Sequence, residues 1–207
     1  MDLSLRRRAV RHLRRADPVM AGIIETVGPC RLEIDPQPPF AALLESIVYQ
    51  QLTGRAAATI HGRVLKALGI RRHPRPEHVA AATDEVLRGA GLSRAKVLAI
   101  RDLAQRAPSL PFRRLFRMEN DAIVESLTVV RGIGRWTVEM YLIFRLGRPD
   151  VLPVHDYGIR KAMQRAYRLR ELPSPDRMEK IAAKWRPWRT VACWYLWRSL
   201  ETKGGRA

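Results

Sequence analysis

Signals that start and stop α-helices recur along the whole chain, and they constrain its fold more than any other feature. Asp17-Pro18 offers an N-cap followed by proline at the first helical position, and Gly28-Pro29 closes the same segment. Thr83, Ser93 and Ser174 occupy the same capping position before three further segments. A chain divided in this way is expected to form a series of short, well-capped helices.

Between these signals, apolar residues recur at helical spacing, as in the segment that begins at Phe40. Apart from a short extended piece at 31–34, no segment shows the alternation of apolar and polar residues that marks a half-buried strand. The expected helices cover residues 18–27, 40–52, 55–68, 84–89, 94–107, 120–129, 135–146, 156–167 and 175–185, with a last one opened by Pro187. The prediction is an all-α fold of about ten helices.

The charge of the chain limits the kind of partner it meets. It holds 38 Lys and Arg against 20 Asp and Glu, which gives a net charge of +18 and an isoelectric point near 11.2. A domain this basic usually binds a polyanion, and nucleic acid is favoured over an anionic surface. Only six of the basic residues are lysine. A GC-rich genome produces the same preference for arginine, so the inference depends on the sign of the charge alone.

Composition also excludes several classes of protein. No run approaches the ~18 to 20 apolar residues that span a bilayer, and no apolar segment follows the basic N-terminal residues as it does in a secretory signal. The two cysteines, Cys30 and Cys193, are too few for a disulfide framework or an iron–sulfur cluster. We therefore expect a cytoplasmic protein without a cofactor, associated with the nucleoid, or nuclear in a eukaryote.

The segment 127–138 carries the strongest functional signal. Gly132 and Gly134 stand two residues apart between amphipathic segments, a spacing that permits positive φ and a bare backbone. The amides there and at the start of the next helix can hold a phosphate together. Arg135 adds charge, and Ile133 anchors the turn in the apolar interior. The alternative is an ordinary helix–turn–helix corner whose glycines serve close packing only.

This segment resembles the helix-hairpin-helix of the base-excision DNA glycosylase superfamily. Members carry an aspartate after the hairpin, and here that residue is Asp156, 22 residues past Gly134. An aspartate at the start of a helix is usually only a cap, but its register behind this hairpin implies catalysis. Bifunctional members carry a lysine nucleophile where this chain has Trp136. The resemblance therefore implies a monofunctional enzyme, which forms no Schiff base.

The wording of three segments narrows the resemblance to the 3-methyladenine DNA glycosylase II family. They are Gly132–Thr137, Ser46–Thr53 and Trp185–Trp197. The four-cysteine cluster of the endonuclease III branch is absent from the sequence, as is the N-terminal β-domain of some members, so we expect a compact version. The resemblance implies a single unit over 1–207 made of two lobes, with the active site in the cleft between them. One lobe covers about 40–110; the other covers about 111–207, with the hairpin, Asp156 and the N-terminal helices.

The family also implies roles for individual residues. Asp156 would stabilise an oxocarbenium-like sugar and orient the attacking water, while the acidic residue that precedes it in some members is His155 here. Gln51, with Gln50 and Leu52 beside it, would fill the gap left by the flipped nucleotide, unless these residues simply end a core helix. Aromatic rings would bind a cationic base by stacking and cation–π attraction.

Four aromatic residues are implied for the base pocket: Trp136, Tyr157, Trp197 and Tyr49. Trp188 and Trp194 are expected to be core residues. The residues implied to contact DNA are Gln50, Gln51, Leu52, Arg131, Gly132, Ile133, Gly134, Arg135 and Thr137. A structural Na+ or K+ would be held by the backbone carbonyls of Thr128, Val130 and Ile133.

The expected activity is removal of alkylated purines of the 3-methyladenine and 7-methylguanine type from double-stranded DNA, by a monomer. Two alternatives remain open. One is a glycosylase for another lesion, such as uracil, hypoxanthine or a mismatch; the other is a helix-hairpin-helix binding module without chemistry. A membrane-surface protein is disfavoured because residues 5–15 are basic but poor in apolar bulk. The sequence leaves open whether the first 16 residues form a DNA-contacting helix or only cover the fold.

Overall fold

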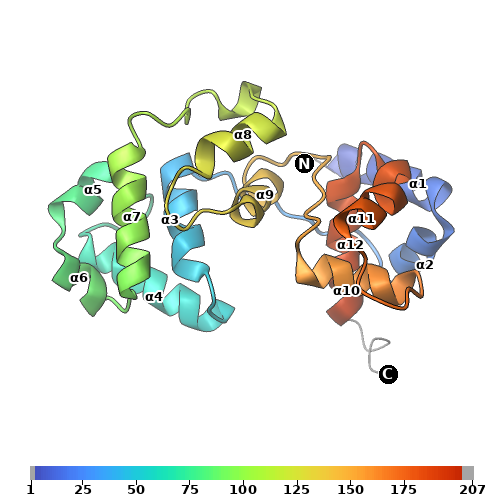
Figure 1. Cartoon of the computed structure of the whole chain (residues 1–207), viewed down its shortest axis with the longest axis horizontal. Helices are drawn as coiled ribbons and strands as arrows, with labels where there is room; N and C mark the ends of the chain where they lie inside the picture. Colours follow the sequence, from blue (N-terminus) through green and yellow to red (C-terminus); the bar gives the residue numbers. More distant parts are fainter. Residues whose placement is uncertain (1–2, 202–207) are drawn as a thin grey trace. The chain divides into compact units, whose positions relative to one another are not determined.

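The computed structural model describes residues 3–201 and is helical throughout that range (Figure 1). It contains twelve α-helices and two short 3-10 helices, and no strand is present between residues 3 and 201. The all-α prediction is therefore confirmed, and the stretch 31–34 pairs with no other strand. No helix in the described part of the chain has both the length and the apolar character needed to cross a membrane.

The chain divides into two compact units, one of which is Pro36–Tyr141; the other combines the residues up to Asp35 with those from Leu142 onward. This division differs from the expected lobes, which joined the hairpin to the C-terminal segment. The hairpin belongs to the first-named unit because it is fastened there: the Arg131 N–H donates to the Asp102 carboxylate over 2.7 Å. The boundary between the units therefore lies inside the helix that follows the hairpin.

The unit Pro36–Tyr141 is built around α3, whose residues Phe40, Leu43, Leu44, Ile47 and Val48 are buried. This helix packs against α4 and α7. Its elements are α3 (Pro39–Tyr49), α4 (Gly54–Ala67), α5 (Pro76–Ala81), α6 (Asp84–Gly89), α7 (Arg94–Arg106), η1 (Leu115–Arg117), α8 (Asn120–Leu127) and α9 (Arg135–Phe144), the last of which crosses the boundary. Helix α3 ends three residues earlier than expected, because Gln51 has a φ of 59° that no helix accommodates.

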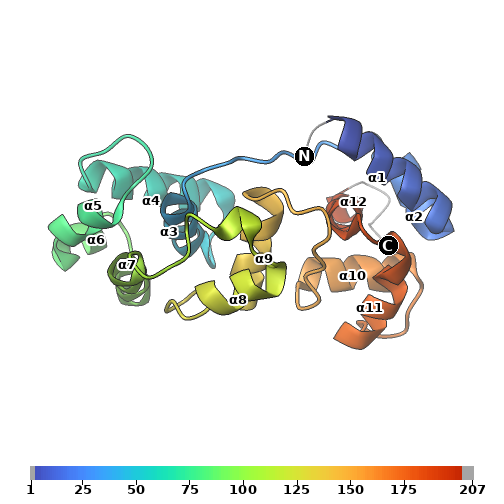
Figure 2. The same ribbon diagram turned by 90° about the horizontal axis from the view of Figure 1, so that it is seen from above.

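The second unit is organised around α12, which packs against α1, α2 and α10 (Figure 2). Residues from Arg189 to Leu196 of this helix are all buried. The elements are α1 (Leu3–Ala16), α2 (Pro18–Val27), α10 (Tyr157–Ala166), α11 (Pro175–Ala182), η2 (Ala183–Trp185) and α12 (Arg189–Glu201). A helix enclosed on several sides must be apolar nearly all round, which explains its run of aromatic and aliphatic residues.

The predicted caps hold their helices as expected. The side chains of Thr83, Ser93 and Ser174 each accept a hydrogen bond from a first-turn amide. Asp17 does the same for α2, accepting from the Val19 N–H over 3.0 Å. Since Asp17 is fully buried, its second carboxylate oxygen needs further partners.

Those partners are the Tyr167 hydroxyl and, at 2.8 Å, the Trp185 indole N–H. Burial by itself raises the pKa of Asp17, but these two donors and the Lys184 ammonium together hold it below its ordinary 3.8. A carboxyl group with a lowered pKa stabilises the fold above the unfolded pKa, and this contribution is lost as the pH falls through the folded pKa.

We expect Asp17→Asn to lower the free energy of unfolding at pH 7 by about 2 kcal/mol, because charge-assisted hydrogen bonds become neutral ones. The difference between wild type and variant should shrink as the pH falls below about 4. Urea unfolding at several pH values measures both effects. A difference that stays constant down to pH 2 would contradict the proposed role of the charge.

Candidate functional site

The predicted hairpin lies between α8 and α9 in the unit Pro36–Tyr141 (Figure 1). The Val130 N–H donates to the Leu127 carbonyl, and the Ile133 N–H donates to the Val130 carbonyl. Ile133 is buried with only 3% exposed, as predicted. Gly132 has a φ of 77°, so the turn has the left-handed backbone that favours glycine.

The two hairpin glycines differ in what the fold asks of them. A Cβ on Gly132 would lie 3.1 Å from the Ala99 Cβ, in addition to the strain of its positive φ. A Cβ on Gly134 would meet nothing within 4 Å, and its φ is not positive. Internal packing therefore explains Gly132 but not Gly134. A bare, exposed amide at the start of α9 is the arrangement that an approaching anion requires.

Two side chains from other helices fix the hairpin. Asp102 on α7 accepts the Arg131 N–H, and this hydrogen bond is the main reason that its pKa lies below the ordinary value. Gln50 donates from Nε2 to the Gly132 carbonyl over 2.8 Å and contacts the Thr137 hydroxyl at 3.4 Å. Gln50 thus joins the end of α3 to the hairpin, a role that the sequence did not reveal.

The turn after α3 presents Gln51 and Leu52 to solvent, and Leu52 is 38% exposed. Lys96 supports this turn from α7: its ammonium donates to the carbonyls of Val48 and Gln50 at 2.6 and 2.8 Å. Burial lowers the pKa of Lys96. These hydrogen bonds satisfy carbonyls that the helix end leaves open, so the two exposed residues sit on a fixed base.

The carbonyls predicted to hold a cation belong to the hairpin loop, and that of Val130 already accepts the Ile133 N–H. Neutral carbonyl oxygens are hard ligands of the kind that alkali cations accept. Among residues 3–201, no group of three or more His, Cys, Asp and Glu side chains is placed to hold a metal ion. Thr128, Val130 and Ile133 therefore stay a prediction for Na+ or K+.

Asp156 stands at the N-cap of α10, in the other unit. Its Oδ1 accepts two hydrogen bonds, from the Ile159 N–H at 2.7 Å and from the Trp197 indole N–H at 2.9 Å. The carboxylate is 9% exposed. The cap expected from the sequence is present, but the indole donor is a second restraint that a simple cap does not have, and it fixes the carboxylate direction.

Gly158 makes the contact between Asp156 and Trp197 possible. A Cβ at this position would lie 3.1 Å from the Asp156 Oδ1 and 3.2 Å from the Trp197 Cδ1. The indole is held on its other side by Phe144, with ring centroids 5.9 Å apart and planes inclined by 29°. Trp197 was predicted as a pocket residue; the structure adds that it donates to the predicted catalytic group.

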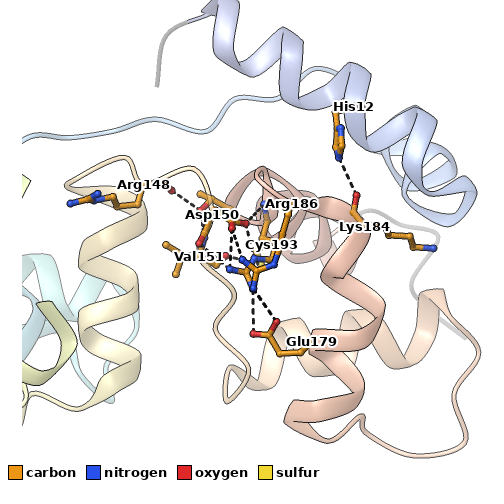
Figure 3. A network of polar contacts seen from close by, with 10 residues as sticks. His12, Arg148, Asp150, Val151, Glu179, Lys184, Arg186 and Cys193 are labelled. Carbon is orange, nitrogen blue, oxygen red and sulfur yellow. Dashed lines mark hydrogen bonds and ion pairs between the residues drawn. The ribbon is translucent and has the colours of Figure 1, made fainter. Parts of the chain in front are cut away.

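A buried ionic network fixes the loop that leads to Asp156 (Figure 3). Arg189, only 8% exposed, donates from Nε to the Asp150 Oδ1 over 2.6 Å and from Nη1 to the Glu179 Oε2 over 3.0 Å. Arg186 adds an ion pair of 3.0 Å to Asp150. The Thr190 hydroxyl donates to the Arg148 carbonyl and accepts from the Val151 N–H. The start of α12 thus holds the loop in place.

The remaining predicted residues lie as follows. Trp136 and Tyr157 are exposed, at 46% and 66%, and Tyr49 packs edge-on against His61 with centroids 6.1 Å apart. Arg135 forms ion pairs with Asp121 and the buried Glu139 at 3.6 and 3.8 Å. Trp194 is a core residue as predicted, 7% exposed and edge-on to Tyr195, whereas Trp188 is half-buried.

The chain was compared with known proteins. Residues 44–187 match the model of the HhH-GPD superfamily of base excision DNA repair proteins. DNA-3-methyladenine glycosylase 1 of Schizosaccharomyces pombe is 33% identical over 193 residues, which cover 91% of this chain and 85% of that protein.

Two solved structures share the fold. A 3-methyladenine DNA glycosylase from Schizosaccharomyces pombe, in complex with abasic DNA, superposes with a TM-score of 0.84 at 31% identity, covering 97% of this chain and all of that one. A DNA-3-methyladenine glycosidase from Bacillus halodurans gives the same TM-score at 36% identity, covering 95% and 90%. The match therefore extends over nearly the whole length of both chains.

Proposed function

This chain belongs to the HhH-GPD superfamily of base excision DNA repair proteins, and from that premise we propose that it is a monofunctional DNA glycosylase for alkylated purines. The observation that carries the proposal is the carboxylate of Asp156, buried and held by the donors Ile159 and Trp197. A binding module has no use for a carboxylate so restrained. The printed names of the similar proteins, which are 3-methyladenine glycosylases, support the same substrate class.

The chemistry follows from the charge of the substrate. A purine alkylated at N3 or N7 is cationic, so the bond to the sugar is weak and the base leaves without protonation. We assign Asp156 the task of stabilising the positive charge that develops on the sugar, and of orienting the water that attacks it. A carboxylate whose position is fixed beforehand costs little reorganisation when that charge appears.

DNA would be held through its backbone and opened at the lesion. The hairpin amides around Gly132 and Gly134 are suited to a phosphate, and the excess of basic residues adds a salt-dependent attraction. With the base extruded, Gln51 or Leu52 would fill the gap, since these are the exposed residues of the turn after α3. Gln50 is bound to the hairpin and is a better candidate for positioning the turn.

The remaining parts of the proposal concern base recognition and cleavage. Tyr157 and Trp197 supply aromatic rings in the unit that holds Asp156, and cation–π attraction favours a charged base there. Trp136 and Tyr49 are candidates from the resemblance in the other unit. Because Trp136 has no amine, no Schiff base forms at that position. We propose a monomer that acts on damaged double-stranded DNA in the cytoplasm, or in the nucleus of a eukaryote.

The test is incubation of the purified protein with methylated genomic DNA, followed by mass spectrometry of the released bases. We expect 3-methyladenine or 7-methylguanine, with abasic sites that stay uncut until alkali is added. Release of uracil or hypoxanthine alone, from matching substrates, would replace the substrate class. DNA binding without any release would indicate a binding module, and strand cleavage without alkali would overturn the monofunctional assignment.

Gly134 provides a separate test of the hairpin. We expect Gly134→Ala to weaken binding to a duplex with an abasic site about tenfold, because the new methyl group lies where a phosphate approaches the amide. The free energy of unfolding should change by less than about 0.5 kcal/mol, as at other open positions.

Gly132→Ala is the matched control for this experiment. Its positive φ and the contact with Ala99 predict a loss of about 1 kcal/mol or more in the free energy of unfolding. Fluorescence anisotropy and urea unfolding measure the two quantities. Unchanged affinity in the stable Gly134→Ala variant would show that this amide contacts no phosphate.

A further inference from the structure

Helix α1 (Leu3–Ala16) carries a basic face that the proposed function does not use. Arg8, Arg11, His12 and Arg15 recur at a spacing of three and four residues, which places them along one side of the helix. The opposite side holds Ala9 and Leu13, both fully buried. The N-terminal helix therefore covers the core with one side and presents a line of cationic groups with the other.

This face forms one wall of a groove. The residues that line the groove are Arg8, Arg11, His12, Arg15, Ala16 and Trp188. Nε2 of His12 lies 3.0 Å from the Lys184 carbonyl, so the helix is tied to η2 four residues before Trp188 (Figure 3). We call these residues the α1 groove.

The charge of the α1 groove is not neutralised within the described structure. Between residues 3 and 201, no carboxylate forms an ion pair with Arg8, Arg11 or Arg15, and all three side chains are exposed. Elsewhere in the same unit the arginines Arg186, Arg189 and Arg198 all have acidic partners. Three neighbouring guanidinium groups without an acid repel one another, and an external anion relieves this repulsion.

The α1 groove is separate from the site at Asp156. Trp188 immediately precedes α12 (Arg189–Glu201), whereas Trp197, which donates to Asp156, lies nine residues further along it. At 1.5 Å per residue these two tryptophans are about 13 Å apart along the helix axis. The groove therefore cannot contact the reacting sugar that Asp156 serves, and an anion bound there lies outside the lesion.

We infer that the α1 groove binds the phosphodiester backbone of undamaged DNA. Guanidinium forks match pairs of phosphate oxygens, and arginines spaced along one side of a helix can meet successive phosphates. The half-buried Trp188 offers an apolar surface against which a deoxyribose can pack. An anionic membrane is the less suitable partner, because the groove has no aliphatic side chain larger than Ala16 to enter the acyl region.

The test is the triple variant Arg8→Gln, Arg11→Gln, Arg15→Gln, with binding to an undamaged duplex measured at several salt concentrations. We expect about tenfold weaker binding at 0.15 M salt, and a slope of log K against log salt that is smaller by about 2 to 3, since each lost phosphate contact contributes about 0.9. Base release under single-turnover conditions with saturating enzyme should stay within twofold of wild type. Because undamaged DNA is the ligand, this test is independent of the proposed chemistry.

The matched control removes the same charge elsewhere in the same unit: Arg170→Gln, Arg177→Gln, Lys180→Gln, all exposed and without a recorded acidic partner in the described residues. It should keep more than half of the wild-type slope change that the first variant loses. Equal losses in both variants would show a general charge effect and overturn the site. Unchanged DNA binding, with lost binding to phosphatidylserine vesicles, would assign the groove to a membrane instead.

Discussion

We expect the Asp156→Asn variant to release alkylated purines about 1,000-fold more slowly than the wild-type protein at saturating enzyme. An amide carries no negative charge to stabilise the developing oxocarbenium ion and cannot take a proton from water. The amide oxygen still accepts from Ile159 and Trp197, as the Asp156 Oδ1 does. Asparagine is also as good an N-cap as aspartate, so the fold and the affinity for undamaged DNA should be retained.

The control for this prediction is Asp17→Asn, the same chemical change at a buried N-cap in the same unit. That variant should lose stability but keep its rate of base release at a temperature well below its unfolding midpoint. Single-turnover release and thermal unfolding of both variants separate the two effects. If Asp156→Asn keeps more than a tenth of the wild-type rate, the carboxylate has no catalytic charge to provide and the assignment fails.

The elements that could be predicted from the sequence are those specified by neighbouring residues. Thr83 and Ser93 cap their helices through amides three residues away, and the hairpin signal lies within one short segment. Asp156 was found by its register behind that hairpin. In each case the interaction that defines the feature, or the pattern that reveals it, is local in the sequence.

Contacts between distant residues explain what could not be predicted. Helix α3 stops at Tyr49 rather than at residue 52, because Lys96 binds the Val48 carbonyl from 48 residues away. Gln50 was predicted to contact DNA, and its hydrogen bond to Gly132 spans 82 residues. Spacing along the chain contains no signal for such pairs, since any of many polar residues could have supplied them.

Helices without a strong apolar pattern were also missed. The segment Pro76–Ala81 is a helix of six residues with one buried side chain, Val79, too short for its periodicity to be read. In α1, two small or aliphatic residues, Ala9 and Leu13, are buried among six arginines. The long arginine stems cover apolar surface beside them, so a helix with little apolar bulk still docks against the core.

The second large effect concerns Arg189. We expect Arg189→Met to lower the free energy of unfolding by about 3 kcal/mol, because it leaves the partly buried Asp150 without its main counter-charge. Methionine fills much of the same volume, so the loss reports the ionic network rather than a cavity. Base release at 20 °C should also fall, since the loop between Asp150 and Asp156 loses the restraint at its start. Urea unfolding and single-turnover release measure the two quantities.

The double variant Arg189→Met, Asp150→Asn tests whether the network acts as a unit. With the carboxylate also removed, no charge is left unpaired at this position, and the double variant should be more stable than the sum of the single losses predicts by about 1 to 3 kcal/mol. Glu179 and Arg186 remain to pair with each other, 3.7 Å apart. Strictly additive losses would mean that Arg189 stabilises α12 by packing alone. The loop to Asp156 would then need another anchor, for which the Thr190 hydroxyl between Arg148 and Val151 is the next residue to replace.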